Sequence, residues 1–509
     1  MEIKLHKIGI IEDSDILLNG LTVVTGENET GKTTVGKALY AIADTVSDLP
    51  QKAKADKDAY ILKELMKITG NTSFSRALFS LSYGLSSEHL DISDQFPALT
   101  TLAARSFVNY RNDIPDPETF AYKTEEELRE FLLLLDADKE TRGSAEWLSR
   151  FLFYYSRETR KTSRLRKDKS ETPDESVMRR LHTQIEDFLK RIRSVFETIK
   201  EDQLLEHYVK DSLNSTLRHD FSRQIQPVRD PDAPSSIALS EGDFSYLKLE
   251  FRKNSVTKAE FHEFPLRKAY LVDNPIVLDH HYNQLMSVYR QFVLKDTKLD
   301  SYFNPQRIRN HTARLSAILR GGEELSPIEQ RVLNEKLNPV REKIDEIVPG
   351  TFDFSRPDDE FYISPEGMEL SLGNLAAGSK MFSVIKILLE RGLLEENSVL
   401  ILDEPEVHLH PKWLNRFAEV VALLVKELRI RVLLTTHSFH FLLALDAYAR
   451  KYEIMDLSNF YQARRLDNGA VTHKRVTKDL AANYDEFVEP LEKMDALRDT
   501  FDKDGDDEA

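Results

Sequence analysis

The pattern of hydrophobic positions predicts several buried strands. Apolar side chains alternate along residues 2–10, and residues 21–25 form the β-branched run LTVVT. Two later runs, VLIL at 399–402 and VLLTT at 432–436, are almost continuously apolar. Parallel strands that are covered on both faces need such runs. We therefore expect an α/β fold, in which a mixed or parallel sheet carries flanking helices.

The segments between these runs have mostly helical spacing. One helix is predicted directly after residue 33, a second near Gly378 and a third over 412–428. Residues 348–364 resemble a hairpin of two short strands. The expected layout is an N-terminal core segment (1–48), a mostly helical insertion (49–245), a return to the core sheet (246–276), a helical segment (277–347), a C-terminal core segment (348–475), and a C-terminal helix with an acidic tail (476–509).

Composition narrows the class of protein. The 509 residues carry a net charge of −16, which disfavours the coating of DNA or anionic membrane by the whole surface but leaves room for a local basic face. The sequence has no cysteine, which excludes disulfides and thiolate metal sites and favours a cytoplasmic location. No window approaches 18 uncharged apolar residues, so we expect no membrane contact.

The stretch GENETGKTT at 26–34 fits the phosphate-binding loop G-x-x-x-x-G-K-[ST]. Glycines let backbone N–H groups turn towards a phosphate, Lys32 supplies a cation, and the hydroxyl of Thr33 is a ligand for Mg²⁺. A chance glycine-rich turn is the alternative, which the preceding strand and following helix disfavour. The residues expected to contact ATP here are Gly26, Asn28, Glu29, Thr30, Gly31, Lys32, Thr33 and Thr34.

The run VLILDEPE at 399–406 places two carboxylates after a buried strand. Nucleotides bind at the carboxyl ends of strands in open α/β sheets, where Asp403 can hold Mg²⁺. Glu404 is then placed to deprotonate the attacking water as a general base. In the alternative interpretation, the two acids only begin a solvated turn.

His437 follows the next predicted strand, 33 residues after Glu404. A strand, a helix and a strand in between would bring its imidazole to the same phosphates, where it could sense the γ-phosphate. A lone histidine after a strand is more often structural. His408 and His410 allow two interpretations, an incomplete metal site or a turn that faces a dimer partner, and we favour the turn.

Four segments together carry a family resemblance: GENETGKTT, NLAAGSK, VLILDEPEVHLHP and LLTTHS, in that order. They resemble the ATP-binding-cassette (ABC) type ATPases, in particular the overcoming-lysogenization-defect-like branch found in bacterial defence systems. The resemblance covers the ATPase core and little of residues 50–265. It implies an ABC-type P-loop NTPase head and a homodimer, or a higher assembly, in which two heads enclose two ATP molecules with Mg²⁺.

The resemblance also assigns a signature segment, Leu375 to Ser379, that meets the ATP held by the other subunit. Asn374, Ala376, Gly378 and Ser379 would contact that nucleotide. The family's serine is replaced by Ala376, so recognition would depend on backbone N–H groups near Gly378, on the helix dipole and on Ser379, and we expect slow or regulatory hydrolysis. We expect position 378 to be exposed. The usual Q-loop glutamine is missing, and Asp273 or Asn274 is the expected substitute.

Some relatives carry a Toprim nuclease after the switch histidine, but we find no such arrangement in the 72 residues after His437. A separate effector nuclease, of HNH or Toprim type, is therefore the expected partner. The resemblance points to ATPase subunits of the Septu and PARIS antiphage defence systems.

A basic run at 157–169, preceded by Tyr154 and Tyr155, could bind nucleic acid. A solvated charged face and a contact with an acidic protein are the other interpretations. The run supports the main alternative function, a DNA-repair or SMC/RecF-like ATPase that clamps DNA directly. A transporter motor subunit ranks last, because of the insertion after the first helix and because of Ala376.

Overall fold

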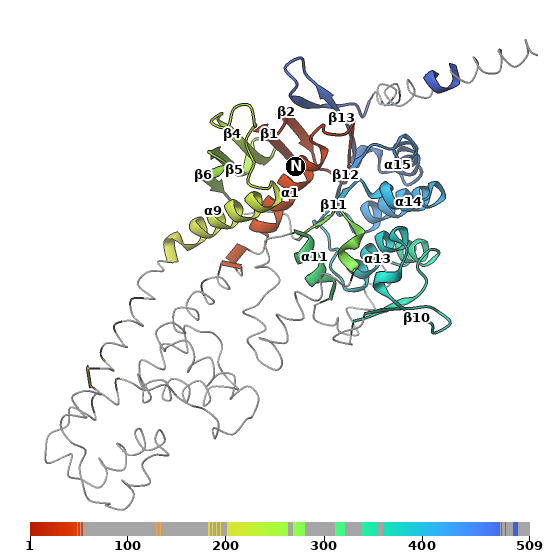
Figure 1. Ribbon diagram of the computed structural model, residues 1–509, viewed down its shortest axis with the longest axis horizontal. Coiled ribbons are helices and arrows are strands. Elements are labelled where there is room, and N and C mark those ends of the chain that lie inside the picture. Colours follow the sequence, from red (N-terminus) through yellow and green to blue (C-terminus); the bar gives the residue numbers. More distant parts are fainter. Residues whose placement is uncertain are drawn as a thin grey trace, which may run out of the picture. The chain divides into compact units, whose positions relative to one another are not determined.

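The computed structural model describes residues 1–47, 201–262, 268–279, 311–320, 337–354 and 360–478, with scattered residues elsewhere (Figure 1). The chain divides into two compact units. The first comprises residues 1–49, 206–293 and 304–509 and contains the features described below. The second comprises residues 50–205 and 294–303, of which few residues are described.

Within the described residues, eleven strands form one main sheet in the order β6-β5-β4-β1-β2-β14-β13-β3-β12-β11-β7. The strands are β1 (Glu2–Ile8), β2 (Ile11–Leu17), β3 (Leu21–Thr25), β4 (Ser235–Glu241), β5 (Phe244–Arg252), β6 (Ser255–Phe261), β7 (Ala269–Val272), β11 (Val399–Asp403), β12 (Arg431–Thr436), β13 (Ser458–Arg465) and β14 (Val471–Arg475). A separate small sheet contains β8 (Thr351–Asp353), β9 (Phe361–Ile363) and β10 (Glu369–Ser371).

The main sheet has a parallel part and an antiparallel part. Strand β3 pairs in parallel with β12 and β13, and β11 pairs in parallel with β12 and β7. At the other end, β2, β1, β4, β5 and β6 follow one another as antiparallel neighbours. The expected α/β class with a mixed sheet is confirmed.

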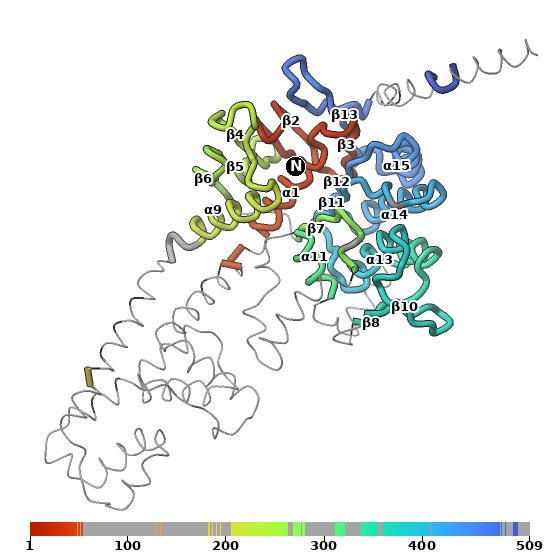
Figure 2. The backbone as a smooth tube through the Cα atoms, in the orientation of Figure 1, coloured from red at the N-terminus to blue at the C-terminus, as the bar shows by residue number. Residues whose placement is uncertain are grey.

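Helices cover both faces of the parallel part. They are α1 (Lys32–Val46), α11 (His311–Arg320), α13 (Ala377–Glu390), α14 (Pro411–Leu428) and α15 (Phe439–Lys451), while α9 (Glu201–Asp220) runs beside β5 and β6. Short 3₁₀ turns occur at η3 (Pro275–Leu278), η6 (Leu372–Asn374), η7 (Pro405–His408) and η8 (Met455–Leu457). Figure 2 traces how α13, α14 and α15 follow one another along one side.

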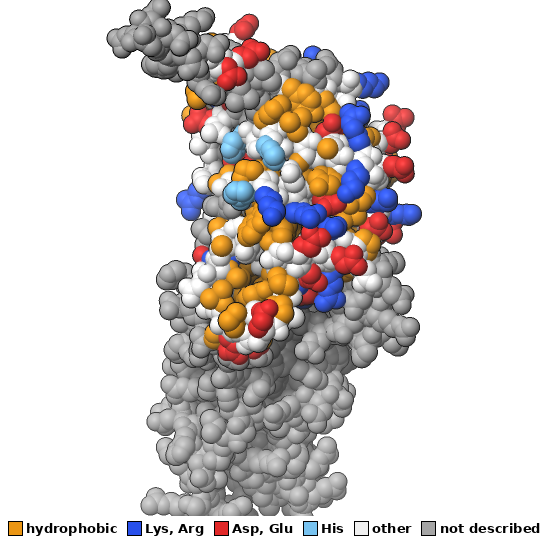
Figure 3. All heavy atoms as spheres, turned by 90° about the vertical axis from the view of Figure 1, so that its right-hand side faces the viewer, with side chains coloured by type: hydrophobic (Ala, Val, Ile, Leu, Met, Phe, Trp, Pro, Cys, Tyr) orange, Lys and Arg blue, Asp and Glu red, His pale blue; other side chains and the backbone are white. Residues whose placement is uncertain are grey.

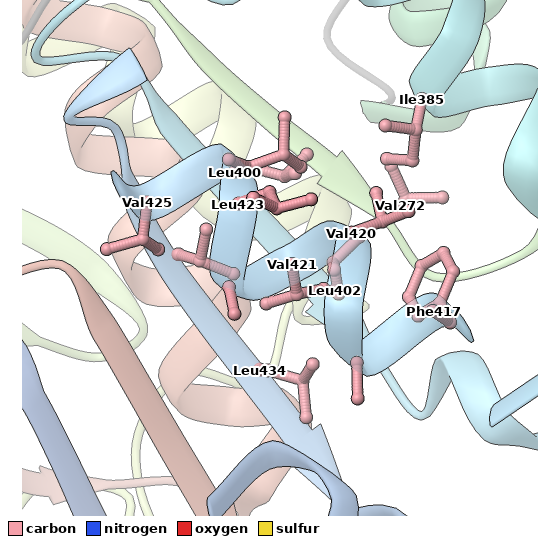
Figure 4. Packing of buried hydrophobic residues seen from close by; sticks show 14 of the residues in the cluster. Val272, Ile385, Leu400, Leu402, Phe417, Val420, Val421, Leu423, Val425 and Leu434 are labelled. Atoms are coloured by element: carbon pink, nitrogen blue, oxygen red, sulfur yellow. The ribbon is translucent and has the colours of Figure 1, made fainter. Parts of the chain in front are cut away.

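Alternate residues of the same strand enter two different cores. Leu400 and Leu402 of β11 pack with α13 and α14, as Figure 4 shows. Val399 and Ile401 belong to the other core, which contains the apolar side of α1. Because both faces of β11 are covered, every residue from 399 to 402 must be apolar, which explains the uninterrupted run in the sequence.

The structure corrects several expectations. Strand β4 lies within the range 49–245, so the boundary of the predicted insertion is too late. The predicted hairpin of two short strands within 348–364 is confirmed as the antiparallel pair β8 and β9, to which β10 adds a third strand that ends at residue 371. Strands β2, β13 and β14 are absent from the sequence analysis; β2 has the polar sequence IEDSDIL, in which only alternate residues are buried. The rest of the predicted insertion and most of 476–509 lie outside the described residues.

Candidate functional site

The phosphate-binding loop joins the end of β3 to the start of α1. Gly26 has φ 143° and Gly31 has φ 75°, which favour glycine. A Cβ atom at Gly26 would lie 2.8 Å from the Cβ of Ala463, and one at Gly31 would lie 3.0 Å from Cγ1 of Ile11. Both glycines are therefore fixed by backbone conformation and by the close approach of neighbouring strands.

Lys32 points back into this loop. Its Nζ donates hydrogen bonds to the carbonyl oxygens of Gly26 (2.8 Å) and Glu27 (2.7 Å), and its side chain is only 4% exposed. The first turn of α1 has no acidic residue and no side-chain cap. A cation and uncapped N–H groups thus face the same space, an arrangement that suits a phosphate.

The other predicted loop residues have different surroundings. Asn28 and Glu29 are exposed, and Thr34 is half-buried. Thr30 is buried, and its hydroxyl donates to the carbonyl oxygen of Glu27 over 2.7 Å, which closes the loop on itself.

Asp403 lies at the end of β11, between two threonines. The hydroxyl of Thr33 donates to its Oδ2 over 2.7 Å, and that of Thr435 donates to its Oδ1 over 2.6 Å. Burial raises the pKa of Asp403, although both hydrogen bonds act in the opposite direction. The sequence analysis assigned Thr33 and Asp403 to Mg²⁺ but did not select Thr435, for which the doubled threonine in LLTTHS was the available signal.

These donors fit a hard divalent cation. Mg²⁺ prefers oxygen ligands and is usually held in nucleotide sites by one or two protein oxygens together with phosphates and water. Thr33 and Asp403 supply a hydroxyl and a buried carboxylate of that kind. Among the described residues, no group of three or more His, Cys, Asp or Glu side chains could hold a metal ion, and the side chain of His408 lies outside those residues.

Glu404 follows Asp403 in a left-handed conformation, with φ 48°. Its N–H donates to the carbonyl and to the hydroxyl oxygen of Thr435, at 3.2 and 3.0 Å. This turn directs the carboxylate between a lysine and a histidine: Oε1 lies 3.6 Å from Nζ of Lys32, and Oε2 lies 3.4 Å from Nδ1 of His437. The side chain is 29% exposed, so water can reach the carboxylate.

Glu406 is a further site residue that the sequence analysis did not select. Its Oε1 accepts hydrogen bonds from the hydroxyl of Thr436 (2.5 Å) and the N–H of His437 (2.9 Å), and it lies 3.6 Å from Nδ1 of His437. Burial raises the pKa of Glu406. Glu406 therefore fixes the start of the segment that carries His437.

Asp273, one of the two candidate Q-loop residues, ends β7 and contacts His311. Nε2 of His311 donates to Asp273 over 2.7 Å, and Nδ1 donates to Asp220 over 2.8 Å. Burial acts to lower the pKa of His311, but these two carboxylates outweigh it and raise the pKa to about 9. Burial likewise acts to raise the pKa of Asp273, but His311 outweighs it and lowers that pKa. This network joins the end of β7 to α9 and α11, and no sequence motif predicted it.

The signature segment is only partly exposed. Asn374, Ala376 and Ala377 are exposed, and Ser379 is half-buried. Gly378 is buried, so the expectation that it is exposed is wrong. Gly378 lies in the first turn of α13, and this helix packs against η3 and η7. This packing covers the small surface of the glycine.

Lys380 fixes the loop that precedes the signature segment. Its buried Nζ donates to the carbonyl oxygen of Gly373 over 2.9 Å and forms an ion pair with Asp279. The loop before α13 is therefore fixed by a buried cation, and Ala376 at its tip stays accessible.

Two further expectations concern the basic run and the membrane. The basic run at 157–169 lies outside the described residues. In the part of the chain that the structure describes, no helix is both long and apolar enough to span a membrane.

Several solved structures share features with this chain at low similarity. An SMC head domain from Thermotoga maritima covers 52% of this chain and 84% of its own, at 13% identity and a TM-score of 0.26. An SMC head bound to the C-terminal winged-helix domain of ScpA covers 95% and 98%, at 9% identity and a TM-score of 0.33. An SMC head from Pyrococcus furiosus with an extended coiled coil, bound to the C-terminal domain of ScpA, covers 96% and 98%, at 9% identity and a TM-score of 0.31.

TM-scores of this size carry no argument about function. No curated protein sequence matches the chain significantly. The model of a protein family, described as the AAA ATPase domain, matches residues 3–442, which include the phosphate-binding loop, Asp403, Glu404 and His437. The chain therefore belongs to the AAA ATPase domain family.

Proposed function

We propose that the protein is an ABC-like ATPase subunit of an antiphage defence complex, which binds and hydrolyses ATP and uses ATP-dependent dimerisation to scaffold or regulate a separate effector nuclease. One observation carries the ATPase part of the proposal. The carboxyl ends of the adjacent parallel strands β3, β12 and β11 bring together Thr33, Asp403, Glu404 and His437.

These residues divide the reaction between them. Lys32 would exchange the loop carbonyls for phosphate oxygens, and Thr33 and Asp403 would hold Mg²⁺, which neutralises phosphate charge when bound. Glu404 orients a water and accepts its proton as the water oxygen attacks the γ-phosphorus, which releases ADP and phosphate. His437, 3.4 Å from Glu404, can donate to the γ-phosphate and so link its presence to the position of the base.

Dimerisation would use the exposed tip of the signature segment. Asn374, Ala376 and Ala377 are accessible to a second copy, whereas the buried Gly378 can act only by shaping the turn. Met368 and Val407, in or beside β10 and η7, are 66% and 56% exposed. Figure 3 views the side of the molecule that bears β10, and hydrophobic side chains gather there beside charged ones. Such a mixed surface suits a reversible contact between copies.

The effector part of the proposal depends on the resemblance carried by DEPEVHLHP. The strands that follow His437 are consistent with this part of the proposal. Strand β13 pairs with β3, and β14 pairs with β2, so both belong to the main sheet. Residues 458–475 are therefore part of the main sheet, and the separate nuclease is the part of the proposal that the resemblance alone supplies.

Replacement of the base tests the ATPase assignment. Glu404→Gln should lower kcat by on the order of 10²–10⁴ because general base catalysis is lost, whereas ATP binding should persist. Phosphate release and equilibrium binding of ATP would be measured in parallel. Glu427→Gln, an equivalent change at an exposed position of α14, should behave as the unaltered chain. Undiminished hydrolysis by Glu404→Gln would refute the assigned base.

A charge at the signature tests dimerisation. Sedimentation velocity of the Glu404→Gln variant should show a dimer with ATP and a monomer without it. Adding Ala376→Glu should abolish the dimer, because a carboxylate would face the triphosphate of the other subunit. Ala447→Glu, on the exposed surface of α15, should leave it intact. An ATP-dependent dimer that survives Ala376→Glu would exclude this interface.

A further inference from the structure

A groove of about 920 Å³ lies at the antiparallel end of the main sheet, away from the strands that form the nucleotide site. It lies where the end of α9 meets the turn between β5 and β6, which run side by side in Figure 1. The residues that line it are Asp211, Asn214, Ser215, Arg218, His219, Arg223, Lys253 and Asn254. Neither the family match nor the proposed reaction gives these residues a role.

The two asparagines present donors to this groove. Oδ1 of Asn254 accepts hydrogen bonds from the N–H groups of Ile225 and Gln226, both at 2.8 Å. Oδ1 of Asn214 accepts one from the N–H of Val256 at 2.6 Å. With the amide oxygens occupied, what each side chain can still offer most readily is its NH₂ group, which only donates.

The end of α9 also has few acceptors left. The carbonyl oxygen of Arg218 accepts from the N–H of Arg223 over 2.6 Å, and that of His219 accepts from the N–H of Ser222 over 3.2 Å. These bonds satisfy carbonyl groups that would otherwise repel an anion at a helix C-terminus.

Charge in the groove is predominantly positive. The lining residues include one carboxylate, Asp211, and three cationic side chains, Arg218, Arg223 and Lys253. Arg218 donates to the hydroxyl of Ser255 and also offsets the negative end of the α9 dipole. Within the described residues, the exposed side chains of Arg223 and Lys253 form no hydrogen bond or ion pair, so their charges are available to a ligand.

The backbone holds these two cations in unusual conformations. Arg223 has φ 67°, and the two-residue turn between β5 and β6 has φ 51° at Lys253 and 55° at Asn254. Turns with two positive φ values favour Asn and Gly, so a lysine there is disfavoured on conformational grounds alone. Strained non-glycine residues of this kind concentrate at functional sites.

We propose that this groove binds phosphate groups, and so forms a second anion site separate from the nucleotide site. Its volume exceeds that of a single phosphate, and its cations come from two different turns, so the ligand carries several phosphates. A nucleic-acid backbone and a free oligophosphate share this chemistry.

The test replaces both cations with residues that suit their backbone. Arg223→Asn combined with Lys253→Asn removes two charges, and asparagine tolerates positive φ, so urea unfolding should show unchanged or greater stability. Lys248→Gln combined with Lys258→Gln removes two exposed charges from β5 and β6 outside the groove and is the matched control. The two probes are a short fluorescent DNA duplex, titrated at several salt concentrations, and pyrophosphate, measured by calorimetry in a Lys32→Ala background that disables the nucleotide site.

If the ligand is a nucleic-acid backbone, the groove variant should weaken duplex binding at least 10-fold and reduce the salt slope by about 1.8, or about 0.9 for each lost phosphate contact. If it is a free oligophosphate, only pyrophosphate binding should weaken, again at least 10-fold. The proposal is overturned if neither probe binds the parent chain, if the groove variant binds both unchanged, or if the control loses as much affinity. Basal ATP hydrolysis should stay unchanged in both variants, so failure here is separate from failure of the ATPase assignment.

Discussion

In the parallel part of the main sheet, β3, β12, β11 and β7 are buried at nearly every position. In the antiparallel part, β4 and β5 alternate between buried and more accessible residues, and β6 has one buried residue, Val256. Helices cover both faces of the parallel strands, whose carboxyl ends gather the nucleotide residues at one edge. The antiparallel strands leave alternate side chains in solvent and carry the proposed phosphate groove at a hairpin turn. The candidate nucleotide site thus lies on the part of the sheet that is covered on both faces, and recognition of a second ligand would use the part that is open to solvent.

The largest expected effect comes from core truncation in each part. Leu402→Ala in β11 and Leu249→Ala in β5, both fully buried, should each lower the free energy of unfolding by about 2–5 kcal/mol, because a cavity replaces a close-packed side chain. Urea unfolding measures this, and Leu466→Ala, at a partly exposed position, is the control.

A shared core would give one unfolding transition in both variants. A separate early transition in Leu249→Ala alone, with ATP hydrolysis retained, would show that the antiparallel part unfolds on its own. A loss below 1 kcal/mol in Leu402→Ala would contradict the packing described for β11.

A smaller effect is expected from one hydroxyl in each part. Thr435→Val removes the hydrogen bond to Asp403 and should lower kcat/KM about 10–100-fold, as loss of an outer partner of a metal ligand usually does. Thr257→Val, at an exposed position of β6, should leave kcat/KM unchanged. Equal rates for Thr435→Val and the parent chain would show that Thr435 does not position Asp403.

The smallest expected effect is a pH dependence that arises beside β7. The pKa of His311 is raised to about 9 in the folded chain, so its stabilisation is complete below pH 6.5 and is lost as pH rises through 9. Unfolding free energies measured from pH 6.5 to 9.5 should therefore fall, and His311→Gln should flatten this part of the profile. An unchanged slope in His311→Gln would place the titrating group elsewhere.

His473 on β14 should give the free energy of unfolding a pH dependence of the opposite sign. Burial, and secondarily the charge of Lys32, lower its pKa to about 4. Its contribution to the free energy of unfolding is present above pH 6.5 and is lost as the pH falls towards 4. The two histidines should thus define the alkaline and acidic limits of a single stability profile, and His311→Gln should alter only the alkaline limit.

How well the sequence predicted the fold differed between the two parts. The runs at 21–25, 399–402 and 432–436 are recognisable as strands because burial on both faces selects apolar residues, with threonine as their only polar member. Strand β2 was missed because its polar residues, Glu12, Asp13, Ser14 and Asp15, resemble a loop until β1 and β14 pair with it. Strand β4 was likewise assigned to the helical insertion, because the strand that joins it to the rest of the sheet, β1, is distant in sequence.

The sequence by itself determined which groups the candidate nucleotide site brings together: Lys32, Thr33, Asp403, Glu404 and His437 stand in short motifs whose spacing follows from strand and helix lengths. Only the tertiary structure decided what depends on contacts between distant segments: the burial of Gly378, the hydrogen bond from Thr435 to Asp403, and the network of His311 with Asp220 and Asp273. The physical reason is that a motif encodes the local backbone and its functional groups, whereas exposure and pairing depend on which other parts of the chain pack against them.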